Sequence, residues 1–240
     1  MVRSVKRALA RGELVADARR ERWAVHRQLR RQEFVEATIR AVTKHGPDVG
    51  MDEIAAESGV SKPVLYRHFA DKADLHLAVG LRAMDMLMDQ LVPALADDGA
   101  IFERISRAVG CYLAFIDQYQ ELYRFMVLRP DSTKTEIVQQ DRNKIAAVLT
   151  DLLTAYLRLF RLETGLAGPS AHGIVGLVQG AGEWWLEHSA ELSRDQLTAH
   201  LTALIWHGID GVLRTGGVVL DPHQQIQLPA QLKLIPGGSG

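Results

Sequence analysis

Hydrophobic positions recur three or four residues apart along almost the whole chain, which is the spacing of helices with one buried face. Alternating β-branched runs flanked by hairpin turns, the usual signal of strands, are absent. Glycine and proline interrupt helices and so divide the chain into segments. The pattern therefore predicts an all-α protein. We expect helices over about 13–45, 51–58, 61–69, 71–93, 100–117, 119–128, 133–161, 170–189 and 193–214.

Helix starts are marked by residues that can cap them. Asp71 and Ser170 carry side-chain oxygens that can accept a hydrogen bond from the first turn of a helix. The sequences Thr133-x-x-Glu136 and Ser193-x-x-Gln196 have the spacing of a capping box. These positions predict where four of the helices begin.

Composition narrows the class of protein. Hydrophobic residues make up 47% of the chain and charged residues 24%, which is typical of a folded protein and not of a disordered one. The only cysteine, Cys111, excludes a disulfide within the chain and a cysteine-based zinc site. The start of the chain lacks the apolar stretch of a secretory signal, and no apolar run reaches the length of a membrane-spanning helix. We therefore expect a cytoplasmic protein without a membrane segment.

Charge is distributed unevenly along the chain. Residues 1–31 carry ten Lys and Arg against three Asp and Glu, a net charge of +7, although the whole chain has a net charge of −1. A basic end on an acidic body suggests a polyanion as partner at that end. Such an arm could lie on DNA phosphates or enter a minor groove. Alternatively, it is a solvated helix extension with Trp23 packed on the core.

The most informative segment runs from Met51 to Lys72. Gly59 can adopt a left-handed turn conformation between two short helices without steric cost. Ser61 can cap the second helix, and Pro63 falls in its first turn, where it removes no hydrogen bond. Leu65 and Phe69 are four residues apart and so share the buried face of that helix. This combination predicts a helix-turn-helix, although a helical hairpin inside a bundle would also explain the apolar positions.

The other face of the second helix offers side chains suited to DNA. Lys62 and Arg67 can reach base edges or phosphates, and Tyr66 and His68 can form hydrogen bonds with phosphate oxygens. A short helix of this kind fits a major groove. The candidate DNA-contact residues are Gly50, Ser61, Lys62, Pro63, Val64, Tyr66, Arg67, His68 and Lys72.

These residues resemble the helix-turn-helix of the TetR family of bacterial transcription regulators. The resemblance rests on Ile54-Ala55, Gly59-Val60-Ser61, Leu65-Tyr66, His68-Phe69 and Lys72, in order and spacing, and covers about residues 34–75. Gly50 departs from the family, whose members often have Ser or Thr at this cap. Glycine can still cap the helix, and the helix N-terminus can still offer N–H groups to a phosphate. The acidic pair Asp52 and Glu53 suits the helix dipole but disfavours close approach of a phosphate.

The resemblance implies an N-terminal three-helix DNA-binding domain and a C-terminal helical bundle that binds an effector and dimerises. We expect a basic arm over 1–30, the DNA-binding domain over 31–75, the bundle over 76–216 and an irregular tail over 217–240. Through the basic arm and the GIVGLVQGAGEWWL segment, the chain also resembles lipid-responsive actinobacterial members of the family.

Apolar faces of the bundle suggest an apolar effector with at most one polar end, such as a long-chain fatty acid or acyl derivative. Methionine side chains adapt to irregular apolar ligands, but they also fill gaps in cores. The candidate pocket residues are Met84, Met88, Phe115, Leu122, Phe125, Met126, Leu149, Leu153, Tyr156 and Trp184.

Three glycines share one face of a predicted helix, since Gly173, Gly176 and Gly180 are three and four residues apart. Glycine weakens a helix, so a close contact is expected to compensate for it. The contact is either with a second subunit, as the family resemblance implies, or within the chain. Leu197, Leu201, Leu204 and Gly208 form a matching stripe on the last helix.

Motifs of common enzyme classes are absent: the chain has no HExxH, GxSxG or P-loop sequence, and its histidines lack a metal-ligand spacing. We therefore expect no enzyme, no cofactor and no metal. The sequence predicts a homodimeric DNA-binding regulator, of repressor type, that an apolar effector releases from a near-palindromic operator. The alternative is a helical lipid-binding protein with weak, non-specific affinity for DNA.

Overall fold

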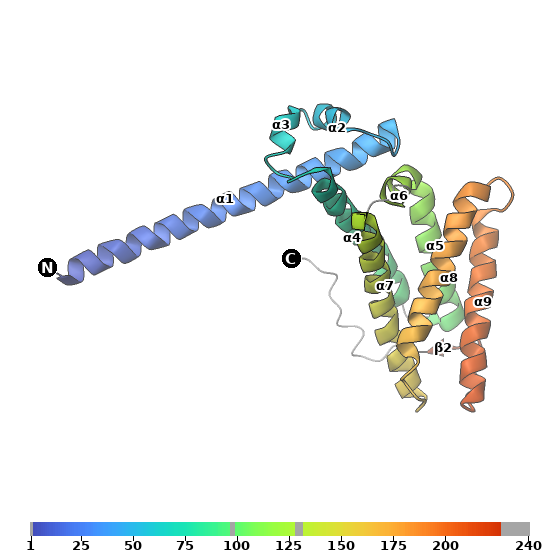
Figure 1. Ribbon diagram of the computed structural model, residues 1–240. Coiled ribbons are helices and arrows are strands. Elements are labelled where there is room, and N and C mark those ends of the chain that lie inside the picture. Colours follow the sequence, from blue (N-terminus) through green and yellow to red (C-terminus); the bar gives the residue numbers. More distant parts are fainter. Residues whose placement is uncertain (1, 97–98, 128–131, 227–240) are drawn as a thin grey trace. The chain divides into compact units, whose positions relative to one another are not determined.

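The structure, a computed structural model, describes residues 2–96, 99–127 and 132–226, with side chains in 23–96, 99–126 and 142–226. Helices dominate the described residues, which confirms the predicted all-α class (Figure 1). The chain divides into two compact units, Met1–Val79 and Gly80–Gly240. The boundary lies close to the one expected after residue 75.

The first unit contains α1 (Val2–His45), α2 (Met51–Glu57), α3 (Lys62–Leu65) and the start of α4 (Lys72–Ala96). The helix expected from Glu13 begins at Val2, because Arg, Ala, Val and Lys fill the preceding positions and one interior glycine, Gly12, costs only about 1 kcal/mol. It ends before Gly46, whose φ of 87° is readily adopted only by glycine.

The core of the first unit joins its helices through fully buried side chains. Phe34 and Val42 of α1 are buried, as are Ile54 of α2, Leu65 of α3 and Phe69 in the turn that follows. The predicted apolar anchors Ile54, Leu65 and Phe69 therefore hold the short helices onto α1.

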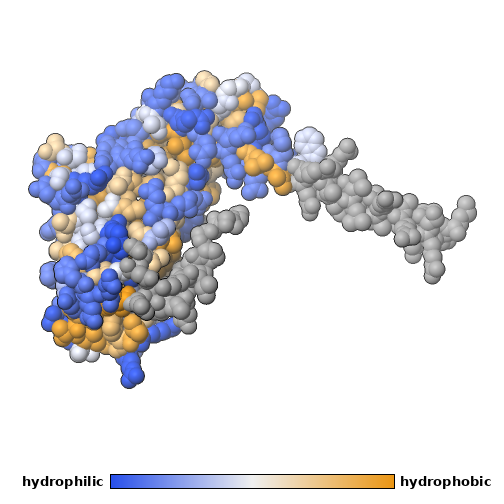
Figure 2. Space-filling view, turned by 180° about the vertical axis from the view of Figure 1, so that it is seen from behind, coloured by the Kyte–Doolittle hydropathy of each residue, from blue (hydrophilic) through white to orange (hydrophobic). Residues whose placement is uncertain are grey.

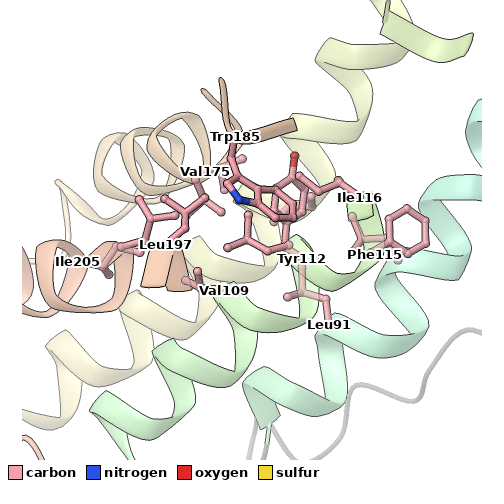
Figure 3. Packing of buried hydrophobic residues seen from close by; sticks show 14 of the residues in the cluster. Leu91, Val109, Tyr112, Phe115, Ile116, Val175, Trp185, Leu197 and Ile205 are labelled. Carbon is pink, nitrogen blue, oxygen red and sulfur yellow. The ribbon is translucent and has the colours of Figure 1, made fainter. Parts of the chain in front are cut away.

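The second unit contains the rest of α4, together with α5 (Ile101–Gln118), α6 (Gln120–Val127), α7 (Ser132–Leu159), α8 (Ala167–His188) and α9 (Arg194–Thr215). Helix α5 packs on α8 and α9, and α7 packs on α8. Side chains such as Tyr112 of α5 and Trp185 of α8 fill the centre of this bundle (Figure 3).

Side-chain capping marks the starts of α4 and α9. Asp71 accepts a hydrogen bond from the backbone N–H of Asp74 at 2.8 Å, and Ser193 forms the predicted capping box with Gln196. The expected start at Ser170 is wrong: α8 begins at Ala167, and Pro169 is tolerated because it lies in the first turn. The side chains of the Thr133–Glu136 capping box lie outside the described residues.

Two short strands were not predicted. β1 (Gly99–Ala100) pairs antiparallel with β2 (Gln225–Ile226), and His223 Nδ1 lies 2.6 Å from Glu103 Oε1. A hydrogen bond to Glu103 raises the pKa of His223. The beginning of the expected irregular tail is thus attached to the bundle, whereas 227–240 lie outside the described residues. A two-residue strand has no periodic pattern, so the sequence could not reveal the pairing.

Candidate DNA interface and effector cavity

The turn between α2 and α3 is built as the sequence predicts. Gly59 has a φ of 65°, and the N–H of Val60 donates to the carbonyl of Ala55 at 3.0 Å. A hydrogen bond of this kind ends a helix whose last turn is followed by a left-handed residue, here Gly59. The turn therefore fixes the direction in which α3 leaves α2.

Helix α3 is shorter than expected. Its regular part is Lys62–Leu65, and the N–H of His68 reaches back only three residues, to the carbonyl of Leu65. Ser61 is the N-cap residue, but its side chain makes no capping hydrogen bond, so that prediction is wrong. The Ser61 hydroxyl remains exposed at the start of the helix.

Tyr66 and Arg67 form the open part of the predicted DNA face. Tyr66 is 44% exposed, although large aromatic side chains are usually buried, and Arg67 is exposed beside it. Pro63 is also exposed, and Val64 is half-buried. The structure thus leaves an aromatic hydroxyl, a guanidinium and a serine hydroxyl exposed within residues 61–67, where they could reach phosphates and base edges.

Lys62 is paired within the unit. Its Nζ lies 3.0 Å from Oδ2 of Asp52, and the hydrogen bond to Asp52 raises the pKa of the lysine. The pair is exposed, so a phosphate could replace the carboxylate at small cost. Asp52, which was expected to suit the helix dipole but to disfavour a phosphate, therefore also holds Lys62.

His68 differs from its expected place on the solvent face. Its ring lies 5.1 Å from that of Phe34 in an edge-to-face arrangement, and it is half-buried. Burial lowers the pKa of His68, and the charges of Arg30, Arg27, Arg67 and Arg31 lower it further. In the structure His68 therefore packs on Phe34, and its surroundings favour the uncharged imidazole.

The remaining candidates, Gly50 and Lys72, form hydrogen bonds at the turn before α2. Gly50 is the N-cap residue of α2, and its N–H donates to Oε2 of Glu53 at 3.0 Å. Nζ of Lys72 donates to the carbonyl of Val49 at 3.3 Å. Both residues fix the turn that precedes α2, so their contribution to DNA binding would be through its position.

An ion pair that has no counterpart in the sequence pattern joins the parts of this unit. The guanidinium of Arg31 donates to both carboxylate oxygens of Asp74, at 2.5 and 3.1 Å, and to the carbonyl of His68 at 2.6 Å. It also lies 4.3 Å from the centre of the Phe69 ring. The hydrogen bond from Arg31 lowers the pKa of Asp74. Residues 43 positions apart give no local sequence signal, so only the fold reveals the pair.

A cavity of about 150 Å³ lies inside the second unit, between α4, α5, α7, α8 and α9. Its walls are almost entirely hydrocarbon. Of the predicted pocket residues, Leu149, Leu153 and Tyr156 line it. The other lining residues are Leu91, Leu95, Ile101, Arg104, Ile105, Ala108, Val109, Tyr112, Ile145, Leu152, Leu157, Phe160, Ile174, Val175, Val178, Gln179, Ile205, Ile209 and Leu213.

The other predicted pocket residues lie elsewhere. Met84, Phe115, Leu122 and Phe125 are buried in packed parts of the structure, and Met88 and Met126 are partly buried. None of these six residues lines the cavity. Trp184 is 49% exposed and stacks on His188, with 4.2 Å between ring centres. It therefore lies on the surface, because it is the neighbouring Trp185 that points into the core.

The glycine face of α8 is open. A methyl group added at Gly173, Gly176, Gly180 or Gly208 would meet no atom within 4 Å, so close packing inside the chain does not explain these glycines. A groove of about 330 Å³ is lined by two of these glycines, Gly173 of α8 and Gly208 of α9, and by the exposed Leu177, Leu204 and Val212. Orange patches interrupt the blue surface of this unit in the space-filling view (Figure 2).

The predicted stripe on α9 is only partly on that face. Leu204 is 46% exposed and Gly208 is open, but Leu197 and Leu201 are buried in the bundle core. Figure 3 shows Leu197 close to Val175 and Ile205 within that core. Leu197 and Leu201 thus belong to the subunit's own packing, and cannot supply an exposed contact.

Comparison with known proteins adds a direct indication of family. Residues 34–79 match the model of the bacterial regulatory proteins of the tetR family, and residues 90–216 match the tetracyclin repressor-like C-terminal domain. An uncharacterized HTH-type transcriptional regulator of Mycobacterium tuberculosis is 36% identical over 219 residues, which cover 89% of this chain and 93% of that protein. The chain belongs to the TetR family. It is a helix-turn-helix transcriptional regulator, as the sequence predicts.

Other similar proteins include a regulator named as an activator and one solved with an acyl-coenzyme A. The HTH-type transcriptional activator FasR of Mycolicibacterium smegmatis is 30% identical over 68% of this chain and 74% of its own length. Among solved structures, the regulator FadR of Bacillus subtilis in complex with stearoyl-CoA has a TM-score of 0.61. It is 13% identical, with 72% of this chain and 96% of that chain covered. A TetR-family regulator of Rhodococcus has a TM-score of 0.62 at 19% identity, over 74% and 97% of the two chains.

The described part of the TetR chain contains neither a candidate metal site nor a helix that could span a membrane. It has no cluster of three or more His, Cys, Asp or Glu side chains that could hold a metal ion. None of its described helices combines the length and hydropathy needed to cross a bilayer.

Proposed function

We propose that this TetR-family regulator binds a near-palindromic operator as a homodimer and is released from it by an apolar small molecule. The proposal rests on two features that occur in the same chain. Tyr66 and Arg67 are exposed in the first unit, and the second unit contains a cavity with almost wholly hydrocarbon walls. Binding to an operator that overlaps a promoter represses transcription, and release relieves that repression. Since the relative FasR is named an activator, the position of the operator decides the sense of control.

On DNA, each subunit would place α3 in a major groove. A two-fold dimer then requires half-sites about one helical turn, roughly 34 Å, apart. Tyr66 and Ser61 would contact phosphates, and Arg67 would read base edges or phosphates. Lys62 would exchange Asp52 for a phosphate when DNA binds.

The exposed face of α8 and α9 supports the homodimer. Gly173, Leu177, Gly180 and Trp184 follow one another at spacings of four and three residues, which is the seam of a helix that packs on another helix. All four are exposed, and glycines permit close approach of the partner. Exposed apolar faces of this kind mark interaction sites. Two such faces would together form a bundle of four helices.

The dimer is tested by a charge placed in that face. Leu204→Glu is expected to turn a dimer into a monomer in sedimentation experiments, because a buried unpaired carboxylate opposes association. Leu159→Glu on α7, at a residue that is 51% exposed, is the matched control and should stay dimeric. A wild-type protein that sediments as a monomer, or a Leu204→Glu dimer, would contradict this interface.

DNA recognition is tested by selecting sheared genomic DNA from the source organism on the protein. Tyr66→Phe and Arg67→Ala should weaken the binding of enriched near-palindromic fragments at constant salt. His68→Phe should matter less, since His68 packs on Phe34. If retention depends on salt but not on sequence, the chain is instead a lipid-binding protein with non-specific affinity for DNA, which is the alternative function.

Coupling between the two units is tested by linkage. An effector that releases the operator must bind the DNA-free state more tightly, and operator DNA must then lower the affinity for effector by the same factor. An affinity for effector that operator DNA leaves unchanged would exclude the release mechanism.

A further inference from the structure

Arg104 is an unusual residue for the wall of an apolar cavity. It belongs to α5, it is 4% exposed, and it lines the cavity of about 150 Å³ in the second unit. Among the described residues of the lining, the others with polar side chains are Tyr112, Tyr156 and Gln179. Arginine is rarely buried unless it is paired with an acid.

The partners of this guanidinium are neutral. Nη1 donates to the hydroxyl of Tyr156, and Nη2 donates to the carbonyl of Leu95 at 2.5 Å. The Nε–H group is buried and finds no acceptor among the described side chains and backbone groups. Within the described residues no carboxylate pairs with Arg104, and the adjacent Glu103 contacts His223 instead. The site thus holds a fixed positive charge and at least one unused donor.

Burying such a charge without a counterion costs free energy. Arginine cannot avoid that cost by losing its proton, because a guanidinium stays protonated in proteins. Tyr156 and Leu95 hold the guanidinium plane in place, which leaves it ready for a bidentate acceptor. The acceptor that matches this planar fork and neutralises it is a carboxylate.

The lining of α5 continues from this charge along one face of the helix. Arg104, Ala108 and Tyr112 lie four residues apart, so the lined face extends about 12 Å beyond Arg104 at the rise of an α-helix. Arg104 stands in its first turn, and hydrocarbon side chains follow. An acid group at Arg104 would thus leave an apolar tail to extend along the cavity.

We propose that the effector is a free monocarboxylic acid with an apolar tail, and that its carboxylate binds Arg104 inside the cavity. This inference rests on the proposed function and specifies the chemical class of the effector. An ester or thioester presents no negative charge at this point, and about 150 Å³ leaves no room for a nucleotide. The free acid, and not its coenzyme A derivative, is therefore the ligand that the site selects.

The wall between the cavity and the neighbouring groove would limit the length of the tail. The volume of about 150 Å³ is comparable to an engineered cavity that accepts a single benzene ring. The cavity shares part of its lining with the groove of about 330 Å³ beside α8 and α9, so the two are separated by one layer of side chains. Longer tails would displace this layer. Its members are Leu153, Leu157, Ile174, Ile205, Ile209 and Leu213.

The experiment compares the head group at constant tail. Decanoic acid, methyl decanoate and decanoyl-CoA are titrated calorimetrically into the full-length protein at neutral pH. Wild-type protein should bind the acid about tenfold or more tightly than the ester or the thioester, as expected for a charge-assisted hydrogen-bonded pair. Arg104→Met should abolish that preference while retaining the ester. Arg107→Met, the same exchange at an exposed arginine on the same helix, should keep it.

Carbon-13 NMR of carboxyl-labelled decanoic acid locates the charge. Bound to wild type, the acid should titrate below its usual pKa, and bound to Arg104→Met it should titrate above it, because the cavity then offers burial without a counterion. Arg104→Gln provides a second neutral variant should the methionine variant fail to fold by circular dichroism.

Each outcome has a distinct meaning. Equal affinity of wild type for acid and ester, tighter binding of decanoyl-CoA, or an acid preference that survives in Arg104→Met would overturn the carboxylate proposal. If none of the three probes, nor longer acids up to palmitic acid, binds at all, the apolar effector itself is refuted, and with it the release mechanism.

Discussion

Arg31 connects three parts of the DNA-binding unit at the scale of single residues. It bonds the carboxylate of Asp74 at the start of α4 and the carbonyl of His68 after α3, and it lies over the Phe69 ring. The Asp74 carboxylate also accepts the N–H of Ala70 at 3.0 Å. Arg31 is therefore a positioning residue. It fixes α3 and the turn after it relative to the start of α4, and it is not one of the candidate DNA-contact residues.

Arg31→Ala should loosen the recognition segment. Losing charge-assisted bonds at a partly exposed site should cost about 1.4 kcal/mol, which corresponds to about tenfold faster hydrogen exchange of amides in α3 and the first turn of α4. Operator affinity should fall as well. Arg40→Ala is the control, since it removes an exposed ion pair with Glu57 that is worth about 0.5 kcal/mol or less. Equal effects of the two variants would show that Arg31 has no positioning role.

His68 should make the stability of this unit depend on pH. Burial beside Phe34 and four nearby arginines lower its pKa in the folded state. The unfolded chain then binds more protons than the folded one between that lowered value and about 6.5. The contribution of His68 to the free energy of unfolding should therefore be fully present above about pH 6.5. It should decline as the pH falls toward the folded-state pKa.

Urea unfolding followed by circular dichroism, at about pH 7.5 and about pH 5.5, measures this difference. His68→Phe lacks the titrating group and should show a smaller decline than wild type. The same decline in both proteins would assign the effect to other groups.

At the scale of residues, the sequence predicts the buried apolar side chains but not the ion pairs. Ile54, Leu65 and Phe69 were predicted because burial leaves a periodic pattern. Ion pairs leave none when the partners are distant in sequence. Arg104 did carry a signal that was overlooked: it precedes Ala108 by four residues and Tyr112 by eight, and so shares their buried face.

At the scale of elements, α8 has two faces that should respond oppositely to the same substitution. A methyl group at Gly180 would meet no atom within 4 Å, whereas one at Gly182 would lie 2.8 Å from Ile116 Cδ1 and 3.2 Å from Tyr112 Cε1. Gly180→Ala should gain about 1 kcal/mol of helix stability within the subunit. Gly182→Ala should not be stabilised in this way, because overpacking of the core would offset the higher helix propensity.

Thermal unfolding at low protein concentration, where the proposed dimer dissociates, compares the two variants. Sedimentation at higher concentration then reports the interface: Gly180→Ala should weaken a dimer that requires close approach at this glycine, and Gly182→Ala should leave its dissociation constant nearly unchanged. If Gly180→Ala dimerises as tightly as wild type, the seam lies elsewhere on the subunit.

Helix boundaries were predictable where one residue type determines them. Gly59 and Gly46 adopt positive φ, and Ser193 with Gln196 caps α9, as expected. The start of α8 was missed because a proline in the first turn is neutral, so Ser170 was not needed as a cap. The cavity was only partly predictable: it depends on which apolar faces of five helices meet, and Trp184 and Trp185 are equivalent in sequence pattern but opposite in position.

At the scale of the whole molecule, the basic arm should contribute to DNA binding through charge alone. Residues 1–22 carry seven Lys and Arg and three Asp and Glu, a net charge of +4, and α1 begins at Val2. At the rise of an α-helix, residues 2–30 of α1 extend about 44 Å, which exceeds the roughly 34 Å of one turn of DNA. A helix of this length would offer cations beyond the bases that α3 could read.

Deleting residues 1–22 should therefore weaken binding to operator and to unrelated DNA by similar factors. The dependence of log affinity on log salt should become shallower by about 0.9 for every phosphate that the arm no longer neutralises, while the ranking of operator sequences stays the same. Replacing the seven basic residues of the arm by glutamine should reproduce the deletion, because it removes the charge and retains the length. A deletion that changes the ranking would instead assign base contacts to the arm, since only contacts to base edges or to groove shape carry sequence information.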